Sequence, residues 1–365
     1  TFAGGSALES AGFLGGNRIA LSSLGTLTVQ TESGTNASLK SAGGQIKISP
    51  LFGSLNFSSS GAVAGKLNIV GGLLQASSEP GHDILIGANI SSNNQALFTA
   101  ANAGSILVQG GLSTIPLLSA PSLILSSGSG NIVVNTSTNQ ITANTGGTGS
   151  VLVSQTGAVA INNSSAGLFF LLSTSGAGDA SIRNPGAISA PIVGLQAGGV
   201  NSNIVVSAPI SAIFSLSLAA SGSGNISDSP QAFWLNSPSI SLTAPQGSID
   251  LRTIAQTINF TSTGNVALTN IGSNLVVTQG NSNLNSLYLT NDRNLLLTSD
   301  VNTSQAGGTA GNITIRASGS LTLGNLQANG ATKAGAIILS AGTNLTASDI
   351  LANGNNGSVS MTAGF

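Results

Sequence analysis

The segment GNITIRASGSLTL, residues 311–323, holds two copies of one short unit, GNITI from Gly311 and GSLTL from Gly319. Each copy is a glycine, a small polar residue and an apolar–polar–apolar triplet. Side chains of a β-strand alternate between its two faces, so Ile313 and Ile315 share one face while Thr314 lies on the other. β-Branched residues such as these favour strands. The unit therefore predicts a short strand that is buried on one face only.

The same unit recurs along most of the chain, which makes self-similarity the strongest signal in the sequence. Its clear copies begin at Gly25, Gly44, Gly65, Gly104, Gly130, Gly149, Gly247, Gly264, Gly311, Gly335 and Gly357. Neighbouring copies lie 19 residues apart at 25–44, 21 at 44–65, 19 at 130–149, 17 at 247–264 and 24 at 311–335. We interpret one such spacing as one coil with two strands and a glycine-rich corner, which gives roughly 18 coils.

A short strand cannot bury its apolar face alone, but stacked coils bury these faces in one continuous core. The sequence thus predicts an all-β fold, a right-handed parallel β-helix (β-solenoid) with about 17–24 residues per coil. We expect residues 1–365 to form a single continuous β-solenoid, with less regular coils over 160–240. Glycine, asparagine and serine clusters are expected to supply left-handed backbone at the corners.

Charged residues are rare: nine Lys or Arg and ten Asp or Glu make up 5% of the 365 residues, and the formal net charge is −1. Nine scattered basic side chains cannot neutralise a run of phosphates, so the composition excludes nucleic-acid binding. The chain has no cysteine, which excludes thiol catalysis, zinc–cysteine sites and disulfides. No run of about 20 apolar residues occurs, so no insertion into a membrane is expected.

The Gly-Asn-Ile and Gly-Ser-Leu strands resemble the repeats of filamentous-haemagglutinin-like surface proteins, which leave Gram-negative cells by two-partner secretion. Residues 310–323 are the most similar part. The resemblance implies a long β-helical exoprotein that serves as an adhesin or an extracellular fibre. The secretion domain of that family carries an Asn-Pro-Asn-Gly type of motif. Here Asn184-Pro185-Gly186-Ala187 lacks the second asparagine, so we expect the chain to belong to the shaft.

Parallel β-helices also include glycan-cleaving enzymes, whose chemistry needs two carboxyl groups a few ångströms apart. Three groups of residues are candidates: Glu79, His82 and Asp83; Asp228, Asp250 and Arg252; and Asp292, Arg293 and Asp300. With coils of about 22 residues, Asp228 and Asp250 could stack on one face, but loops rich in cation ligands are missing. We expect solvated corners with the ion pairs Asp250–Arg252 and Asp292–Arg293. We therefore predict no enzyme and no catalytic, cofactor-binding or metal-binding residue.

Three further features have a structural interpretation. His82 follows a Pro-Gly pair and is expected to be a turn residue. Trp234 is expected to fill the core or a coil end, with an outward sugar-stacking platform as the alternative. Thr26 and Thr28 could belong to a flat ice-binding face, but such pairs do not persist from coil to coil. These residues therefore add no specific chemistry.

Asn-x-Ser/Thr sequons are numerous, as chance predicts in a chain rich in these residues. They include Asn36, Asn56, Asn89, Asn225, Asn259, Asn312 and Asn344. Asparagines at the corners can also stack into side-chain ladders from coil to coil. We therefore read these asparagines first as structural residues, with glycosylation as a second possibility.

Together these features predict a secreted, cell-surface structural protein, a β-solenoid shaft or fibre subunit of a bacterial filament or adhesin. Low charge permits close packing, and neither terminus shows a polar or helical cap, so we expect a head-to-tail or lateral homopolymer. Glycans of a host or neighbouring cell surface are a further expected partner. Three alternatives stay open: a segment of a long monomeric secreted adhesin, a glycan-active β-helix enzyme, and a phage-type spike.

Overall fold

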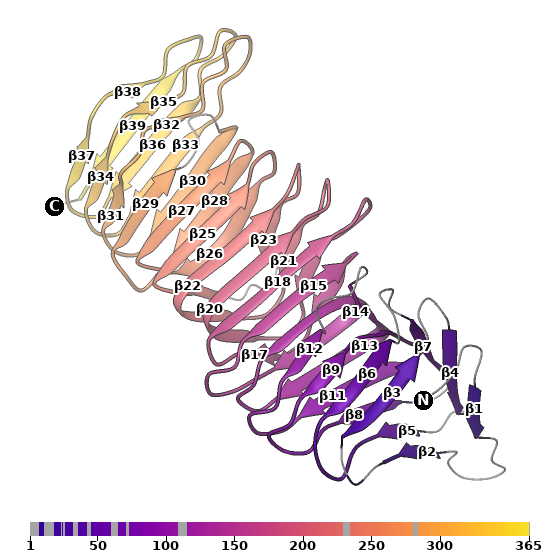
Figure 1. Ribbon diagram of the computed structural model, residues 1–365. Helices are drawn as coiled ribbons and strands as arrows, with labels where there is room; N and C mark the ends of the chain where they lie inside the picture. The colour runs from indigo at the N-terminus through magenta and orange to yellow at the C-terminus, as the bar shows by residue number, and fades with distance from the viewer. Residues whose placement is uncertain are drawn as a thin grey trace. The chain divides into compact units, whose positions relative to one another are not determined.

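The computed structural model describes residues 7–10, 18–22, 24, 26–31, 36–41, 45–59, 65–70, 73–108, 115–228, 234–279 and 284–364. These residues include no helix, and therefore none long and apolar enough to cross a membrane. Parallel strands stack into a β-solenoid of about 13 turns with about 23 residues per coil (Figure 1). The predicted fold class is confirmed and the coil length lies within the predicted 17–24 residues, but the coils are fewer than the roughly 18 expected.

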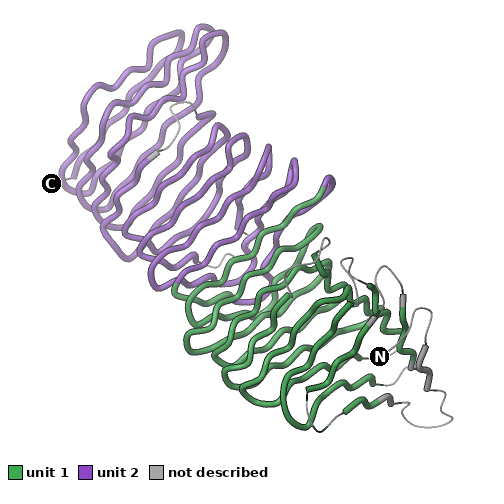
Figure 2. Tube along the Cα trace, viewed as in Figure 1, with its two compact units in different colours: residues 1–176, 188–191 green, residues 177–187, 192–365 purple. Residues whose placement is uncertain are grey.

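The coils divide into two compact units, which are described separately (Figure 2). Unit 1 comprises Thr1–Gly176 and Ile188–Pro191, and unit 2 comprises Ala177–Ala187 and Ile192–Phe365. Residues of β20 (Ile188–Ala197) belong to both. Within each unit, the strands form columns in which a strand pairs with its equivalent one coil later.

Unit 1 has three columns of strands. The first contains β3 (Leu27–Thr31), β6 (Leu55–Ser59), β9 (Ile84–Ile86), β12 (Ile106–Val108), β15 (Val151–Thr156) and β18 (Phe169–Ser175). The second contains β1 (Ala7–Ser10), β4 (Asn36–Ser41), β7 (Lys66–Val70), β10 (Asn89–Ser92) and the start of β13 (Leu118–Ser127). The third contains β2 (Arg18–Leu21), β5 (Gln45–Ile48), β8 (Leu74–Ser77), β11 (Gln95–Ala100) and β16 (Val159–Ile161). The long β14 (Ile132–Asn144) pairs with members of all three columns, and also with β17 (Ser164–Ser165).

A coil near the start of unit 1 contains three strands, not the two expected from the sequence. Leu27 of β3 pairs with Leu55 of β6, 28 residues later, and β4 and β5 lie between them in the chain. The glycine units at 25, 44 and 65 therefore lead into strands of three different columns, and they do not mark successive coils. The units at 130 and 149 do mark successive coils, because Ile132 pairs with Val151.

Unit 2 is also built from columns. The first contains β19 (Ile182–Asn184), β21 (Ile204–Val206), β23 (Ile226–Asp228), β26 (Ile249–Ile254), β28 (Asn265–Asn270), β30 (Ser286–Asn291), β33 (Ile313–Ala317), β36 (Ala336–Ala341) and β39 (Ser358–Ala363). The second contains β22 (Ile210–Ala220), β25 (Ser239–Ala244), β27 (Thr257–Ser262), β29 (Leu275–Gln279), β31 (Leu295–Leu297), β34 (Leu321–Leu323) and β37 (Leu345–Ala347). Two-residue strands complete the unit. One is β24 (Leu235–Asn236), which pairs with β22 and β26. The other three form a separate sheet: β32 (Val301–Asn302), β35 (Leu326–Gln327) and β38 (Ile350–Leu351). Here the predicted spacings at 247–264 and 311–335 are single coils, because Ile249 pairs with Val266 and Ile313 with Ile337.

The core consists of aliphatic side chains stacked one per coil. In unit 2 one inward column contains Ile182, Ile204, Ile226, Ile249, Val266, Leu287, Ile313, Ile337 and Val359. The first eight of these are at most 1% exposed, and each such buried side chain contributes about 1.5–3 kcal/mol. In unit 1, Phe57 and Phe98 meet edge to face with their ring centroids 6.2 Å apart. The alternation within each triplet thus produces a continuous core.

Two buried asparagines stack where strands of unit 2 end. Asn270 and Asn291 pair in register and are at most 1% exposed. Asn270 Oδ1 accepts hydrogen bonds from Thr253 Oγ1 and Ala255 N, both at 2.8 Å, and its Nδ2 donates to Asn291 Oδ1 at 2.9 Å. These bonds satisfy buried polar groups at a corner that strand pairing leaves open.

Candidate functional site

Polar side chains form a ladder from coil to coil at the residues that lead into the first strand column of unit 2. Asn203 Oδ1 accepts a hydrogen bond from the backbone nitrogen of Asn225 at 2.8 Å, and Asn225 Oδ1 accepts one from Ser248 N at 2.7 Å. Ser248 Oγ in turn accepts one from Asn265 N at 3.2 Å. Each of these side chains therefore pairs with a backbone N–H of the next coil, at the first residue of the strand or at the residue just before it.

The same arrangement recurs within each unit. One ladder of unit 1 contains Asp83, Ser105, Asn131 and Ser150. Other ladders of unit 2 are Asn274–Asn294–Ser320, Asp300–Asn325–Asp349 and Ser304–Asn329–Asn353. The sequence predicts stacked asparagine side chains; in these ladders asparagine, serine and aspartate oxygens instead accept hydrogen bonds from backbone N–H groups. Among the sequon asparagines, Asn225 is a ladder member, and Asn312 Oδ1 accepts a hydrogen bond from Ala336 N at 2.9 Å.

The glycines that precede the ladder residues Asn131, Ser150, Ser248 and Asn265 have a different role from the one expected. A Cβ on Gly247 would overlap the carbonyl oxygen of Gly224, one coil earlier, and Gly130, Gly149 and Gly264 are blocked in the same way. None of these four has a positive φ. Left-handed glycines lie at other turns: Gly53, Gly81, Gly147, Gly157, Gly176, Gly222, Gly272 and Gly354. The unit therefore requires glycine because two backbones approach too closely for any side chain.

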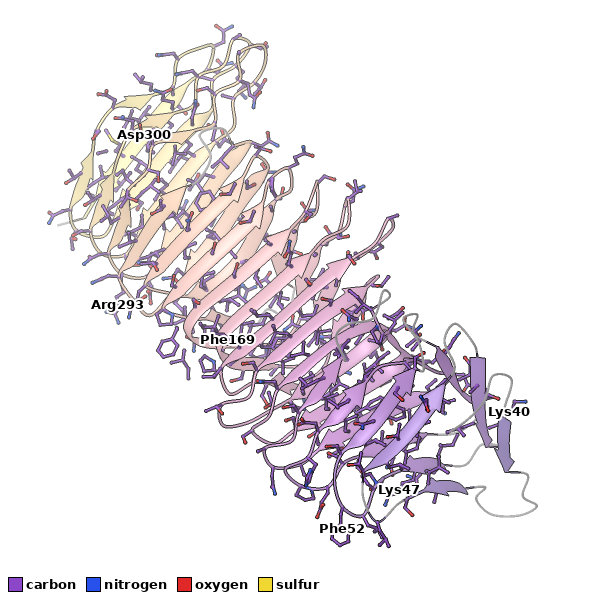
Figure 3. All side chains as sticks on the ribbon, viewed as in Figure 1. Lys40, Lys47, Phe52, Phe169, Arg293 and Asp300 are labelled. Carbon is purple, nitrogen blue, oxygen red and sulfur yellow. The ribbon has the colours of Figure 1, made fainter. Side chains whose placement is uncertain are left out.

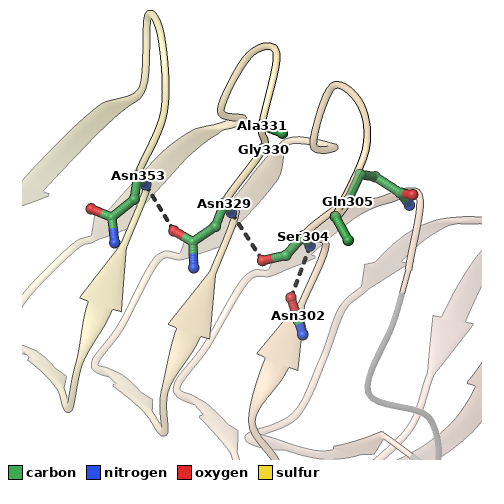
Figure 4. Close-up of a pocket in the computed structure, with 8 residues that line it drawn as sticks. Asn302, Ser304, Gln305, Asn329, Gly330, Ala331 and Asn353 are labelled. Atoms are coloured by element: carbon green, nitrogen blue, oxygen red, sulfur yellow. Dashed lines mark hydrogen bonds between the residues drawn. The ribbon is translucent and has the colours of Figure 1, made fainter.

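A cleft of about 600 Å³ opens beside the Ser304–Asn329–Asn353 ladder of unit 2 (Figure 4). Its lining residues are Asn302, Ser304, Gln305, Ala306, Asn329, Gly330, Ala331 and Asn353. None of them is charged. The ladder bonds of 2.7 and 2.9 Å fix the backbone of this wall, and the amide groups offer both donors and acceptors to a ligand. Sequence reasoning missed this cleft, because the loops that form it lie between strands and carry no recognised motif.

The first acidic cluster connects neighbouring coils of unit 1. Glu79 Oε2 accepts a hydrogen bond from Gly53 N at 2.8 Å and lies 3.9 Å from His82 Nε2. Asp83 Oδ1 accepts one from Ser105 N at 2.8 Å. His82 follows Gly81, which has a φ of 87° in a turn, as the sequence predicts. Both carboxylates thus bind backbone N–H groups of adjacent coils.

The second cluster differs from its predicted arrangement. Asp250 pairs in register with Ser227, so Asp228 lies one residue further along its strand. Arg252 Nε lies 3.6 Å from Asp228 Oδ2, which is buried and accepts no hydrogen bond from the described residues. Burial raises the pKa of Asp228 above its usual value, the Arg252 guanidinium lowers it in part, and the Asp250 charge adds to the rise. Arg252 therefore forms its ion pair with the preceding coil, although the sequence predicted one with Asp250.

The residues of the third cluster lie in one coil, and its two carboxylates bind the coils on either side. Asp292 Oδ1 accepts a hydrogen bond from Gly272 N at 2.8 Å, and Asp300 Oδ1 accepts one from Asn325 N at 3.0 Å. Asp300 is thus the first member of a ladder. In the part of the chain that the structure describes, no group of three or more His, Asp or Glu residues is placed to hold a metal ion. The first and third clusters consequently bind backbone groups of neighbouring coils, whereas the second connects two coils through a side-chain ion pair.

Two other residues singled out from the sequence lie in unit 2. Trp234 precedes β24 and is half-buried, so it neither fills the core completely nor stands free of it. Asn184 is 1% exposed, and its Nδ2 donates to Ala208 O at 2.8 Å while its Oδ1 accepts from Ser207 N at 3.0 Å. The Asn184-Pro185 segment therefore lies in an ordinary inter-coil contact.

The last described strand, β39, exposes residues that other coils bury. Val359 and Met361 pair in register with Ile337 and Leu339 of β36, which are at most 1% exposed. Val359 itself is 44% exposed and Met361 57%. Among the described residues, β36 is the strand that pairs with β39. The inward positions and one edge of β39 are thus available to a further coil.

Comparison with protein-family models, curated proteins and solved structures found no match for this chain.

Proposed function

We propose that the protein is an extracellular structural protein, a β-solenoid shaft or fibre subunit of a bacterial surface filament or adhesin. The observation that carries this proposal is the repetition, coil after coil, of an aliphatic core column and a polar corner ladder. Charged side chains such as Lys40, Lys47, Arg293 and Asp300 are few and scattered (Figure 3). Low charge supports the proposal, because copies that pack closely then meet little repulsion.

We propose further that copies assemble head to tail. An unpaired strand edge is a template for another strand. β39 supports this mode, since a docked coil would cover Val359 and Met361 and continue the core column. A head-to-tail contact joins two different surfaces, and it produces an open fibre when the rotation does not close a ring.

Negative-stain electron microscopy and analytical ultracentrifugation of the whole chain test this assembly. We expect filaments that lengthen with protein concentration. Met361→Asp should abolish them, because it places a charge at an inward position of the contact. Ser360→Asp on the same strand is the matched control, since its neighbours in register point outward. Circular dichroism checks that both variants keep their strands.

A sharp monomer at high concentration, with no concentration dependence, would contradict head-to-tail assembly. Isolated rods would then favour the second reading, a segment of a long monomeric adhesin. Equal loss of filaments in Met361→Asp and Ser360→Asp would also count against β39 as the contact.

The uncharged cleft favours an adhesive role, and we propose that it binds a neutral surface glycan. Its amides and hydroxyl suit sugar hydroxyl groups, which both donate and accept hydrogen bonds. Dextran and mannan are suitable probes for titration calorimetry. Asn329→Ala and Asn353→Ala should weaken binding at least about tenfold if two hydrogen bonds are lost, whereas Asn325→Ala, on a neighbouring ladder outside the cleft, should not. Absence of binding to a broad glycan panel would refute this role and leave the shaft proposal untouched.

A further inference from the structure

A row of aliphatic side chains points outward from unit 1. The inward residues Ile84, Ile106, Ile132, Val151 and Phe170 are buried, and the residue after each of them lies on the opposite face of its strand. These following residues are Leu85, Leu107, Val133, Leu152 and Leu171, and they pair one above the next through successive coils. We call these five residues the outer row. Its last three members are 38–39% exposed.

The outer row departs from the usual pattern of a half-buried sheet, in which the outward face is polar. The corresponding positions in unit 2 are mixed. Ile338 is 38% exposed, but its neighbours in register are Thr314 and Ser360. Single exposed apolar residues are normal on a protein surface, whereas a contiguous group marks an interaction surface. Five aliphatic residues in one line belong to the second class.

The surroundings of the outer row decide which partner suits it. Beside the last three members of the outer row the outward positions are uncharged, with Asn131, Ser150 and Phe169 on one side and Asn135, Ser154 and Ser173 on the other, whereas Asp83 lies beside Leu85 at one end. A charged partner surface would lose its hydration here without gaining an ion pair. An uncharged aliphatic row with the same spacing of about 4.8 Å along the stack would lose nothing and could interdigitate, as facing sheets do in dry zippers. The outer row itself has this composition and spacing, so the outer row of a second copy is a matching partner.

We propose that the outer row is the contact through which two copies of this chain pack side by side. A single row covers less than the roughly 800 Å² per partner of a stable complex, so two isolated chains pair weakly. Filaments repeat the row in every subunit, and many weak contacts then act together. This lateral bundling rests on the proposed filament, whereas weak pairing of single chains does not.

Sedimentation of the whole chain with Leu152→Asp tests the contact. We expect lateral self-association to weaken at least about tenfold, because each pair would bury two carboxylates. Ile338→Asp is the matched control: it places the same charge on an equally exposed outward residue outside the row. It should leave association unchanged. In electron micrographs, Leu152→Asp should give single filaments where the wild type gives bundles.

Cysteine crosslinking locates the contact directly, because the natural chain has no cysteine. Val133 is the middle residue of the outer row, so it meets its own copy whether the two rows run parallel in register or antiparallel about their centre. Val133→Cys with a short bis-maleimide should therefore give a covalent dimer, and Ile338→Cys should not. Leu171→Cys should crosslink to itself only in the parallel arrangement.

The outcomes separate the two proposals. Bundling that persists in Leu152→Asp, or equal crosslinking at 133 and 338, overturns the outer row as the contact. Pairs that depend on Leu152 in a preparation without filaments support the outer row and contradict head-to-tail assembly. Single filaments in the wild type, without dimers at any concentration, overturn the lateral contact alone.

Discussion

Asn225 Oδ1 lies 2.7 Å from the backbone nitrogen of Ser248, one coil later. A side chain thus supplies the acceptor for an N–H at the start of a strand. The preceding residue, Gly247, lies so close to Gly224 that no Cβ fits. The following residue, Ile249, is fully buried. Three successive positions of the repeated unit therefore have three separate physical requirements: no side chain, a short acceptor and an aliphatic group.

Replacing Gly247 by alanine should destabilise the protein. Its Cβ would overlap the Gly224 carbonyl oxygen, and the backbones must then move apart, at a cost of about 1–3 kcal/mol. Gly308→Ala is the control, because nothing lies within 4 Å of its added Cβ. Urea unfolding of both variants measures the difference. Equal stability would show that the coils separate at no cost.

Asn225→Ala should lower the free energy of unfolding by about 0.5–1.5 kcal/mol, because Ser248 N loses its acceptor. Asn225→Ser should restore most of this loss, since Ser248 itself accepts through its hydroxyl group from Asn265 N. Hydrogen exchange at the Ser248 amide reports the bond directly. If the Ser248 amide stays protected in Asn225→Ala, the ladder bond does not contribute to stability.

Asn270→Ala should be more costly, about 1–3 kcal/mol for each buried group that it leaves unpaired. Ala255 N and Asn291 Oδ1 are hydrogen-bonded to Asn270, and the Ala255 carbonyl oxygen would keep only its bond from Ser273 Oγ. Asn265→Ala on the same strand removes an exposed asparagine and is the matched control. Thermal unfolding compares the two, and a smaller effect at 270 than at 265 would contradict the internal ladder.

Asp228→Asn should remove a pH dependence of stability. Burial raises the pKa of Asp228, so the folded state holds its proton more tightly than the unfolded state does. The stabilising contribution of this group is thus complete below the unfolded-state pKa, and it is lost as the pH rises through the higher folded-state pKa.

The amide of Asp228→Asn cannot ionise, so we expect its melting temperature at neutral pH to equal or exceed that of the wild type. The gain should disappear in acid. Asp250→Asn removes the charge that adds to the rise in the Asp228 pKa, so its pH dependence of stability should be smaller than that of the wild type but should not vanish. A large loss of stability in Asp228→Asn at neutral pH would mean instead that the Arg252 ion pair outweighs burial.

Alternation in the triplets was enough to predict parallel stacked strands and the aliphatic core. The number of strands per coil was not predictable from the motif, because the units at 44 and 65 enter β5 and β7, in different columns. One unit specifies one strand, and its spacing does not reveal how many strands complete a turn. The sequence predicts left-handed backbone at the glycines, since sequence alone does not show how closely two coils approach.

The polar sites were predicted less well, for a related reason. Corner ladders follow from the composition, but which asparagine becomes buried depends on where each strand ends, as at Asn270. The outer row was also hidden, because Leu152 and Leu171 come into line only when the register of β15 and β18 is known. No motif in the sequence marks two residues about 20 positions apart as neighbours in register.

Each ladder oxygen accepts a hydrogen bond from the coil that follows. The glycines, acceptors and amides must therefore keep the same phase from one coil to the next. Inserting or deleting one whole coil at Gly247 or Gly264 keeps every glycine above a carbonyl oxygen and every acceptor above an amide. A partial coil would shift both out of phase. Evolution can therefore change the length of such a protein in discrete steps, one coil at a time, without redesigning the coils that remain.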